Sequence, residues 1–438
     1  MLKLIVFIIG VNLSLVPWVQ AELNISITGY VEDAVPIAVV PFGWKGKGRL
    51  PGDMAKIIAN DLARSGQFKS MSRNKMASRP QQPKEVRFPE WRRLGSDYLV
   101  IGHIESSTVD RYRIRFYLFD VVRGHQVAAY TIPIRPRVFR KAAHRIADIV
   151  YEKITGEKGA FDTRIAYVTV EKKRAGGNLY RLKIADSDGH NAKTMITRSH
   201  SIMSPAWSPD GSKIAYVSFE TKRPNIYIQE VATGRRQRLK AFKGINSAPA
   251  WSPDGHKLAL VLSHGRNPDI HIYDVRSKKF KRITRHYAID TEPMWSKDGR
   301  SIIFTSDRGG SVQLYEVPIA GGRAKRLTFE GNYNARPRLS ADGRYLAMVH
   351  RERGDPDFQI GVLDRQDDTF TVLTNGKLDE SPSFSPNGRM IIYAASGPRS
   401  RGLLAAVSVD GQVHQRLALQ KGSVREPAWS PFSRHSGK

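Results

Sequence analysis

Two hydrophobic patterns divide the chain near residue 161. In the first half, short apolar strands alternate with segments whose apolar residues follow helical spacing. The strands are expected at 36–42, 97–104, 112–122 and 126–134, and the helices at 53–65 and 137–154. This mixture predicts a compact α+β domain over residues 36–161, with a polar loop at 81–89 and a hinge at 155–160.

After residue 161 the helical spacing disappears and one turn motif repeats. The motif PAWSPDG begins at residue 205 and returns in related form at 249, 293, 337, 382 and 427, at intervals of 44 or 45 residues. Its proline fixes φ, its aspartate can bond to its own backbone and its glycine accepts positive φ, so the motif predicts a turn. The aromatic residue is suited to packing between neighbouring repeats. A period of about 40–45 residues is typical of four-stranded propeller blades.

The register of the repeats predicts how the ring closes. The first unit supplies three strands, at 164–169, 178–184 and 193–197, with no inner strand before them. The last inner strand, at 425–429, has no strand after it. Pairing these two incomplete units makes a sixth blade and removes the exposed edges of an open array. We therefore expect a six-bladed all-β propeller over residues 162–438, closed by pairing of the C-terminal strand with the first blade.

Residues 1–21 have the pattern of a secretory signal peptide. Lys3 is the only charged residue before Glu22, an apolar run follows it, and Val19-Gln20-Ala21 offers small side chains to a signal peptidase. The alternative is a membrane anchor, but the run is too short to span roughly 30 Å of hydrocarbon. We expect cleavage after Ala21 and a soluble, exported protein.

The mature N-terminus predicts a strand with two possible partners. Leu23, Ile25 and Ile27 alternate with polar residues, and this period of two suits a strand added to the sheet edge of another protein. The alternative is a strand within the N-terminal domain of the protein itself. Both interpretations are compatible as two states of one segment.

Composition narrows the chemistry that the protein can perform. The chain has 438 residues and no cysteine, which excludes disulfides, thiolate nucleophiles and cysteine-ligated metal sites. Its formal net charge is +29. Residues 22–161 contain 24 Lys and Arg against 14 Asp and Glu, and residues 162–438 contain 45 against 27, so the charge is spread over both halves.

An even spread of charge argues against a nucleic-acid partner, because such binders usually concentrate charge in a patch or stripe. Basic clusters at 235–238 and 278–282 fall on the expected outermost strands of blades, where lysine and arginine discourage aggregation between sheet edges. Binding to an anionic membrane or lipopolysaccharide surface remains a third hypothesis, which high salt would abolish.

Known catalytic and metal-binding motifs are absent from the sequence. It contains neither GxSxG nor HExxH, and GWKGKG at 43–48 lacks the Lys-Ser/Thr of a phosphate-binding loop. Asp186-Ser-Asp188-Gly189 lacks the other ligands of a calcium loop and is interpreted as an ordinary turn. We therefore predict no catalytic residue, no metal ligand and no cofactor.

The order of signal peptide, α+β domain and six blades resembles the TolB family, the periplasmic propeller proteins of the Tol-Pal system. The resemblance covers essentially the whole chain. Its more specific segments are PIAVVPF at 36–42, KGAFDTRIAYV at 158–168, MSPAWSPDGSK at 203–213, TEP at 291–293 and PAWSP at 427–431. Two departures are Arg338-Leu339, in place of a small-aromatic pair, and residues 431–433, which lack Asp-Gly.

The resemblance implies a monomeric, non-enzymatic adaptor that helps to maintain the outer membrane during cell division. In that family the lipoprotein Pal docks on the mouth of the propeller channel, and the C-terminal domain of TolA captures a mobile N-terminal segment. Pal binding draws this segment back onto the body of the protein. Membrane association is then expected only through partners. The alternative function is an accessory or gate of a periplasmic hydrolase.

Two sets of residues follow as candidate partner-binding sites. The mobile segment is placed at residues 22–35, and its partner-binding residues are Glu22, Leu23, Asn24, Ile25, Ser26, Ile27, Thr28, Gly29, Tyr30, Val31, Glu32 and Asp33. The channel mouth is placed just before each motif proline, at the start of the inner strands. Its residues are Ser204, Ala248, Thr291, Glu292, Arg336, Glu380, Ser381 and Glu426.

Overall fold

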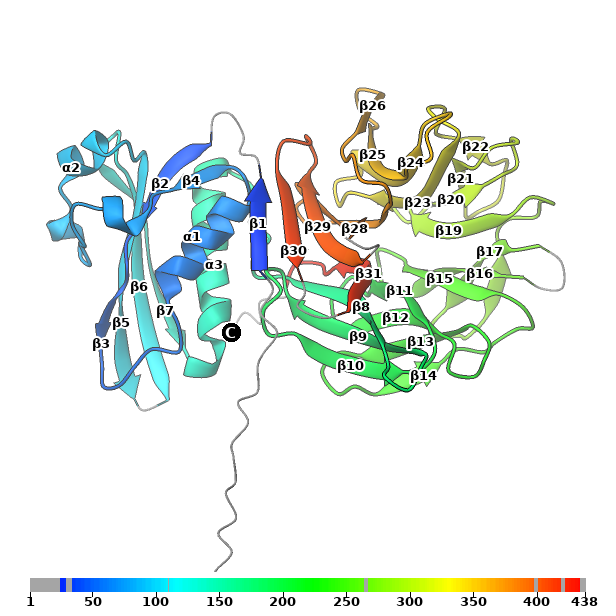
Figure 1. Cartoon of the computed structure of the whole chain (residues 1–438), viewed down its shortest axis with the longest axis horizontal. Coiled ribbons are helices and arrows are strands. Elements are labelled where there is room, and N and C mark those ends of the chain that lie inside the picture. Colours follow the sequence, from blue (N-terminus) through cyan, green and yellow to red (C-terminus); the bar gives the residue numbers. More distant parts are fainter. Residues whose placement is uncertain are drawn as a thin grey trace, which may run out of the picture.

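A domain of helices and strands lies beside a six-bladed β-propeller in the computed structural model of this chain (Figure 1). The structure describes residues 24–28, 34–108, 110–263, 267–397, 401–418 and 422–433. The α+β domain followed by a closed six-bladed propeller is the fold predicted from the sequence, and it is confirmed. The predicted signal peptide, and Glu22, Leu23 and residues 29–33 of the predicted mobile segment, lie outside the described residues. None of the helices in the described ranges is long and apolar enough to cross a membrane.

The N-terminal domain is a mixed sheet covered by helices on both faces. The sheet has the order β4-β2-β5-β6-β7, with β3 paired to β5. Its strands are β2 (Val35–Val39), β3 (Gly43–Lys45), β4 (Phe68–Ser70), β5 (Tyr98–Thr108), β6 (Arg111–Asp120) and β7 (His125–Ile134). The helices are α1 (Met54–Arg64), α2 (Phe88–Arg93) and α3 (Phe139–Thr155), with 3₁₀ turns at Arg73–Lys75, Pro83–Glu85 and Pro136–Val138. Figure 1 shows α1 and α3 between this sheet and the propeller.

Local signals define both long helices. Asp53 caps α1 by accepting a hydrogen bond from the backbone N–H of Lys56 at 3.0 Å, and the apolar face of α1 packs into the core with that of α3. The helix is followed by Gly66, whose φ is +74°. A Cβ at Gly66 would lie 2.1 Å from a methyl group of Val413, so glycine allows the end of α1 to approach the propeller closely.

The predicted polar loop at 81–89 is wrong in part. It contains a 3₁₀ turn in which the Glu85 carboxylate accepts from the backbone N–H groups of Gln81 and Gln82, and α2 begins at its end. Trp91 of α2 is fully buried against the second face of the sheet. A helix of 6 residues is too short to give a clear helical period, which is why the sequence pattern missed it.

Each propeller blade contains four antiparallel strands, and one blade carries a fifth. In the blade that closes the ring, the strands are β31 (Ser423–Trp429), β8 (Arg164–Lys172), β9 (Asn178–Asp186) and β10 (Lys193–Arg198). The next three blades are β11 (Ile202–Trp207), β12 (Lys213–Ser218), β13 (Asn225–Glu230) and β14 (Arg236–Arg238); β15 (Asn246–Trp251), β16 (Lys257–Leu262), β17 (Asp269–Asp274) and β18 (Phe280–Arg282); and β19 (Asp290–Trp295), β20 (Ser301–Ser306), β21 (Gln313–Pro318) and β22 (Lys325–Arg326). The last two are β23 (Tyr333–Leu339), β24 (Tyr345–Arg351), β25 (Gln359–Asp364) and β26 (Thr369–Val372); and β27 (Asp379–Phe384), β28 (Met390–Ser396), β29 (Gly402–Ser408) and β30 (His414–Ala418).

The repeated motif joins blades as well as forming turns. The indole N–H of Trp251 donates to the carbonyl of Ala206 at 3.2 Å, and that of Trp295 donates to Ala250 at 3.0 Å, so each bond reaches the inner strand of the preceding blade. Trp207 donates in the same way to Ala428 at 3.0 Å, across the closure of the ring. β31 pairs antiparallel with β8, as the register of the repeats predicted.

The N-terminal strand β1 (Asn24–Thr28) belongs to the propeller. It pairs antiparallel with β30, from Asn24 opposite Ala418 to Thr28 opposite His414, and becomes the outermost strand of that blade. Figure 1 shows β1 between α1 and β30. The alternative that this segment is a strand of the N-terminal domain is therefore wrong, because its sheet partner is β30, the outer strand of a propeller blade.

Deleting residues 423–438 from the C-terminal end should destabilise the whole propeller. The change removes β31 and exposes the edge of β8, and a buried valine such as Val424 alone contributes about 1.5–3 kcal/mol. We expect the Tm followed by circular dichroism to fall by roughly 10 °C or more, with a broader transition. Truncation of residues 434–438 is the matched control, and an equal effect of the two deletions would contradict closure by β31.

Candidate functional site

The channel mouth is built from one left-handed residue in each inner strand. Ser204, Ala248, Glu292, Arg336, Ser381 and Glu426 have φ values between 48° and 58°, and the pairing register shifts at each of these positions. Such bulges re-aim side chains, and a non-glycine residue in this conformation costs on the order of 1 kcal/mol. Because all six inner strands contain such a residue and the residue types differ, the left-handed conformation is imposed by the geometry of the blade and not by the residue type.

The structure brings most of the predicted mouth residues together. Of the eight, those lining the cavity in the channel are Ser204, Ala248, Glu292, Arg336 and Glu426. Ser381 contacts this group through the Arg336 side chain. Thr291 and Glu380 each precede a left-handed residue by one position and are not among the residues that line the cavity.

An ion-pair network centred on Arg336 crosses the channel. The Nε of Arg336 lies 2.9 Å from Oε1 of Glu292, and its Nη1 lies 3.3 Å from Oε1 of Glu426. Glu426 also accepts from the backbone N–H of Ser204 at 3.3 Å. Burial opposes the charge on Arg336, but the carboxylates of Glu426, Glu292 and Glu380 outweigh it and hold the pKa of the guanidinium above its ordinary value. The network ties together strands from different blades.

Arg338 lies deeper in the channel and has a different environment. It lines a cavity of about 240 Å³ together with the motif residues Trp207, Trp251 and Trp429. Its Nη1 donates to the carbonyl of Pro337 at 2.8 Å, and within the described ranges no carboxylate oxygen lies within 4.0 Å of its guanidinium. Burial lowers the pKa of Arg338. The departure from the repeat motif therefore places a cation in the channel interior.

Large exposed apolar side chains lie at the end of the ring where the inner strands begin, and sequence reasoning missed them. They are Ile245, Tyr287, Ile289, Phe329 and Leu378, here called the apolar rim. Each lies in the loop just before an inner strand, so the propeller topology places them at the same end of the ring. Tyr287 is 85% exposed and Phe329 is 70% exposed. A concentration of exposed aromatic side chains is typical of a protein-binding surface.

The rim residues could have been predicted from their position in the loop before each inner strand. An apolar residue in a loop that immediately precedes an inner strand has no place in the blade core. The loops differ in length and sequence, so they show no period of their own.

The second candidate site is the paired edge of β1 and β30. Asn24, Ile25, Ser26, Ile27 and Thr28 of the predicted segment form β1 on the edge of the propeller. The neighbouring residue Gln415 of β30 donates its Nε2 hydrogen bond to the carbonyl of Arg64 at the end of α1. The docked segment therefore lies where the two domains meet.

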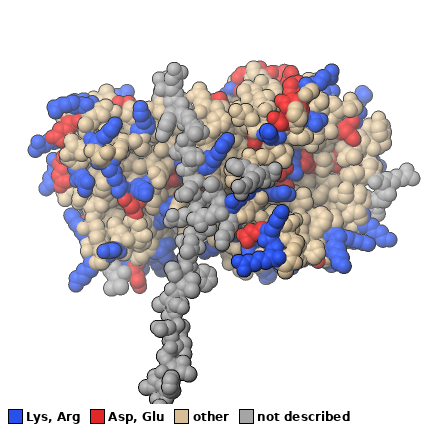
Figure 2. All heavy atoms as spheres, viewed as in Figure 1, with Lys and Arg blue, Asp and Glu red and all other residues tan. Residues whose placement is uncertain are grey.

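Positive charge is distributed over both domains of the face drawn in Figure 2, with acidic residues among the basic ones. The basic clusters predicted at blade edges do lie there, because β14 and β18 are the outermost strands of their blades. Some arginines also pack on aromatic rings, as Arg236 does over Tyr227 at 4.8 Å from the ring centre.

Comparison with known proteins matches both domains. The model of the TolB amino-terminal domain matches residues 23–127, and that of the TolB beta propeller domain matches residues 151–433. A protein of Thioalkalivibrio sulfidiphilus named Tol-Pal system protein TolB is 63% identical over 414 residues, which cover 94% of each chain. Another of the same name from Nitrosococcus oceani is 61% identical over 415 residues, or 95% of each chain. The crystal structure of TolB from Acinetobacter baumannii superimposes with a TM-score of 0.86 at 40% identity, covering 94% of this chain and all of the other.

Replacing Arg336 by methionine should destabilise the propeller by leaving Glu292 and Glu426 without their shared cation. We expect a loss of about 1–3 kcal/mol in urea unfolding, below that of a fully buried pair because these side chains keep some exposure. Arg353→Met, at an exposed arginine, is the control. Adding Glu426→Gln should recover part of the loss, and a loss equal to that of the control would contradict the network.

Proposed function

Because the chain belongs to the TolB family, we propose that it is a periplasmic, non-enzymatic adaptor of the Tol-Pal system. It links the outer-membrane lipoprotein Pal to the inner-membrane protein TolA and so helps the outer membrane to follow the inner one during cell division. Residues 1–21 are removed on export, residues 22–35 form the partner-binding segment, and residues 36–161 and 162–438 form the two domains. The protein acts as a monomer and reaches membranes only through its partners.

The observation that carries this proposal is the mouth of the propeller, where the apolar rim and the Arg336 network lie at the same end of the ring. Tyr287 and Phe329 offer large, rigid apolar surfaces, and aromatic residues supply much of the binding energy at protein interfaces. Charged groups at the centre fix the orientation of a partner and reject unsuitable ones. The mouth is therefore the docking site that we assign to a Pal-type lipoprotein.

The β1 segment supports the second half of the proposal. It already docks by backbone pairing, and the same pairing edge suits addition to the sheet of a TolA C-terminal domain. A strand of 5 residues makes few hydrogen bonds, so its release costs little compared with unfolding a domain. The segment cannot pair with β30 and with TolA by the same edge at once, and this exclusion makes a two-state switch.

Replacing Tyr287 and Phe329 by serine should weaken binding of the soluble domain of Pal, because the change removes two aromatic anchors. We expect Kd to rise roughly tenfold or more by isothermal titration calorimetry. Val372→Ser is the matched control, since Val372 is also exposed but lies on β26, the outermost strand of its blade. Equal affinity of the double variant and the control would overturn the assignment of the mouth.

Replacing residues 22–33 with a Gly/Ser linker of equal length should abolish TolA binding and weaken Pal binding. The second effect is expected because docking of the segment and Pal binding favour each other, and coupling between two sites is reciprocal. We expect roughly a fivefold loss of Pal affinity, the lower end of typical couplings. Unchanged Pal affinity would refute the coupled switch while leaving the mouth site intact.

A further inference from the structure

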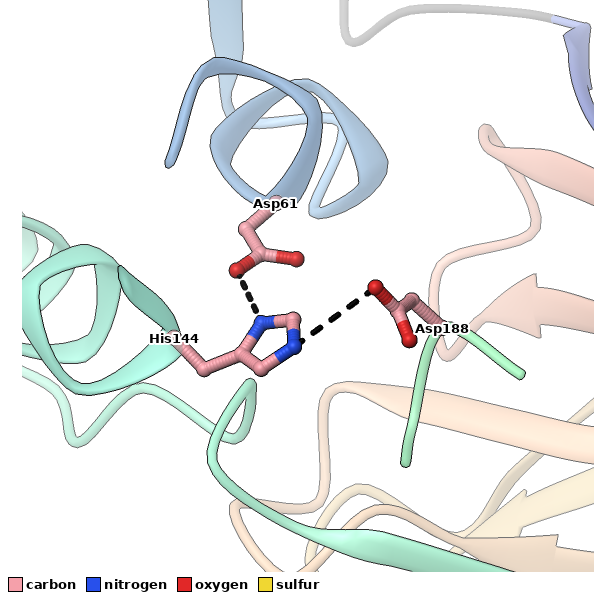
Figure 3. Close-up of side chains that lie close together, drawn as sticks. All are labelled: Asp61, His144 and Asp188. Carbon is pink, nitrogen blue, oxygen red and sulfur yellow. Dashed lines mark hydrogen bonds and ion pairs between the residues drawn. The ribbon is translucent and has the colours of Figure 1, made fainter. Parts of the chain in front are cut away.

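A buried cluster of ionisable side chains joins the two domains (Figure 3). Asp61 comes from α1, His144 from α3, and Asp188 from the hairpin between β9 and β10. Nδ1 of His144 lies 2.5 Å from Oδ2 of Asp61, and its Nε2 lies 3.6 Å from Oδ2 of Asp188. All three residues are buried. The imidazole therefore stands between one carboxylate of its own domain and one of the propeller.

Further charges surround this cluster on every element packed against it. Arg64 pairs with the other oxygen of Asp61 at 2.7 Å, and Arg140 pairs with Asp188. The remaining charged or titratable groups nearby are Lys141, Arg145 and Asp148 on α3, Asp162 in the connection between the domains, and Asp186 and His190 on the propeller hairpin. With neutral His144, the charges of Asp61, Asp188, Arg64 and Arg140 cancel.

A metal ion is the first ligand to consider for these residues. One nitrogen of His144 and one oxygen from each of Asp61 and Asp188 all lie within 4.8 Å of one another. However, each carboxylate already binds an arginine, so a divalent cation would have to enter a buried site beside two guanidinium groups. That repulsion is strong where water is excluded. A proton satisfies the same nitrogen and brings only one charge.

We propose that a proton on His144 holds the N-terminal domain against the propeller, and that its loss at higher pH loosens the interface. As an imidazolium, His144 donates Nδ1–H to Asp61 and directs Nε2–H toward Asp188. As a neutral ring it keeps the bond to Asp61, but the lone pair of Nε2 then faces a carboxylate. Among the described residues the buried Nε2 makes no hydrogen bond, and Asp188 at 3.6 Å is its ion-pair partner, so nothing compensates for the loss of that attraction.

The electrostatics of the cluster agree with this geometry. Burial alone would lower the pKa of His144, but the charges of Asp61 and Asp188 outweigh burial and raise the pKa above its ordinary value. Burial would raise the pKa of Asp188, yet His190, Arg64, His144 and Arg140 hold it well below its usual range, so the carboxylate stays ionised. A raised histidine pKa stabilises the folded interface fully below about pH 6.5, the unfolded value, and the stabilisation is lost as pH rises through the folded value.

The cluster is connected to the docking edge of β1. The Nη1 of Arg64 donates to the carbonyl of Ser187 at 3.2 Å, next to Asp188, and the Arg64 carbonyl accepts from Gln415 of β30. Movement at this end of α1 therefore acts on the strand with which β1 pairs. Protonation of His144 would then favour the docked state of β1, and this step rests on the proposed function. The pH dependence of the interface does not rest on it.

The experiment measures the separation between the domains in the full mature chain without any partner. The chain has no cysteine, so Lys69→Cys and Thr371→Cys, at exposed positions in the two domains, take spin labels at known sites. We expect the distance distribution to broaden as the pH rises from about 5 to about 8, the range in which an ordinary histidine loses its charge, and to continue above it because the pKa of His144 is raised. In His144→Gln it should be broad throughout, whereas His256→Gln, at an exposed histidine, should behave like the parent.

A distribution that does not change with pH, or one that changes equally in His144→Gln, would overturn the proposal. Asp188→Asn serves as a second variant if His144→Gln does not fold, and it should also lose the pH dependence. A further outcome is that added Zn²⁺ raises the Tm of the parent but not that of His144→Gln. This result would show that the cluster binds a metal ion in place of the proton, and it would also overturn the proposal. None of these results depends on Pal or TolA, so failure here is separate from failure of the proposed function.

Discussion

Pairing of β31 with β8 is the constraint on which the rest of the structure depends. The last described strand of the chain completes the first blade, and Trp207 bonds to Ala428 across the junction. Glu426, a partner of Arg336 in the mouth, is itself carried by β31, so Arg336 has both of its carboxylate partners only in the closed ring. The chain then returns to the connection between the domains, where Ser433 donates to the carbonyl of Asp162. Closure, mouth and domain interface are thus physically continuous.

Sequence repetition explains why the propeller and its mouth could be predicted. Six copies of one motif supply the period, the turn and the register, and a residue just before each motif proline falls at the same place in every blade. The apolar rim could not be predicted in this way, because Tyr287 and Phe329 lie in loops that do not repeat. Helix α2 was missed because Trp91 is buried by tertiary packing that a short segment does not reveal. The sheet partner of β1 was missed because an alternating pattern fits any open sheet edge, and β30 lies at the far end of the chain.

The interdomain cluster shows a different limit of sequence reasoning. Asp61, His144 and Asp188 come from three segments far apart in the chain, and none of them lies in a motif of metal or catalytic chemistry. The segment around Asp188 is an ordinary turn, as the sequence indicated, with Gly189 at φ 84°. Its role comes from what packs against it, namely the ends of α1 and α3. Packing buries this turn residue against charged partners from distant parts of the chain, and a local sequence pattern cannot reveal those partners.

The six left-handed residues of the mouth have a consequence for how recognition can diversify. Serine, alanine, glutamate and arginine all occupy the same backbone position in different blades, at nearly the same φ. The scaffold therefore accepts a change of side chain there without a change of main-chain path. The six blades thus provide six equivalent positions around the axis, each of which can carry a different side chain. The surface of the mouth can therefore change by single substitutions while the backbone of the ring stays the same.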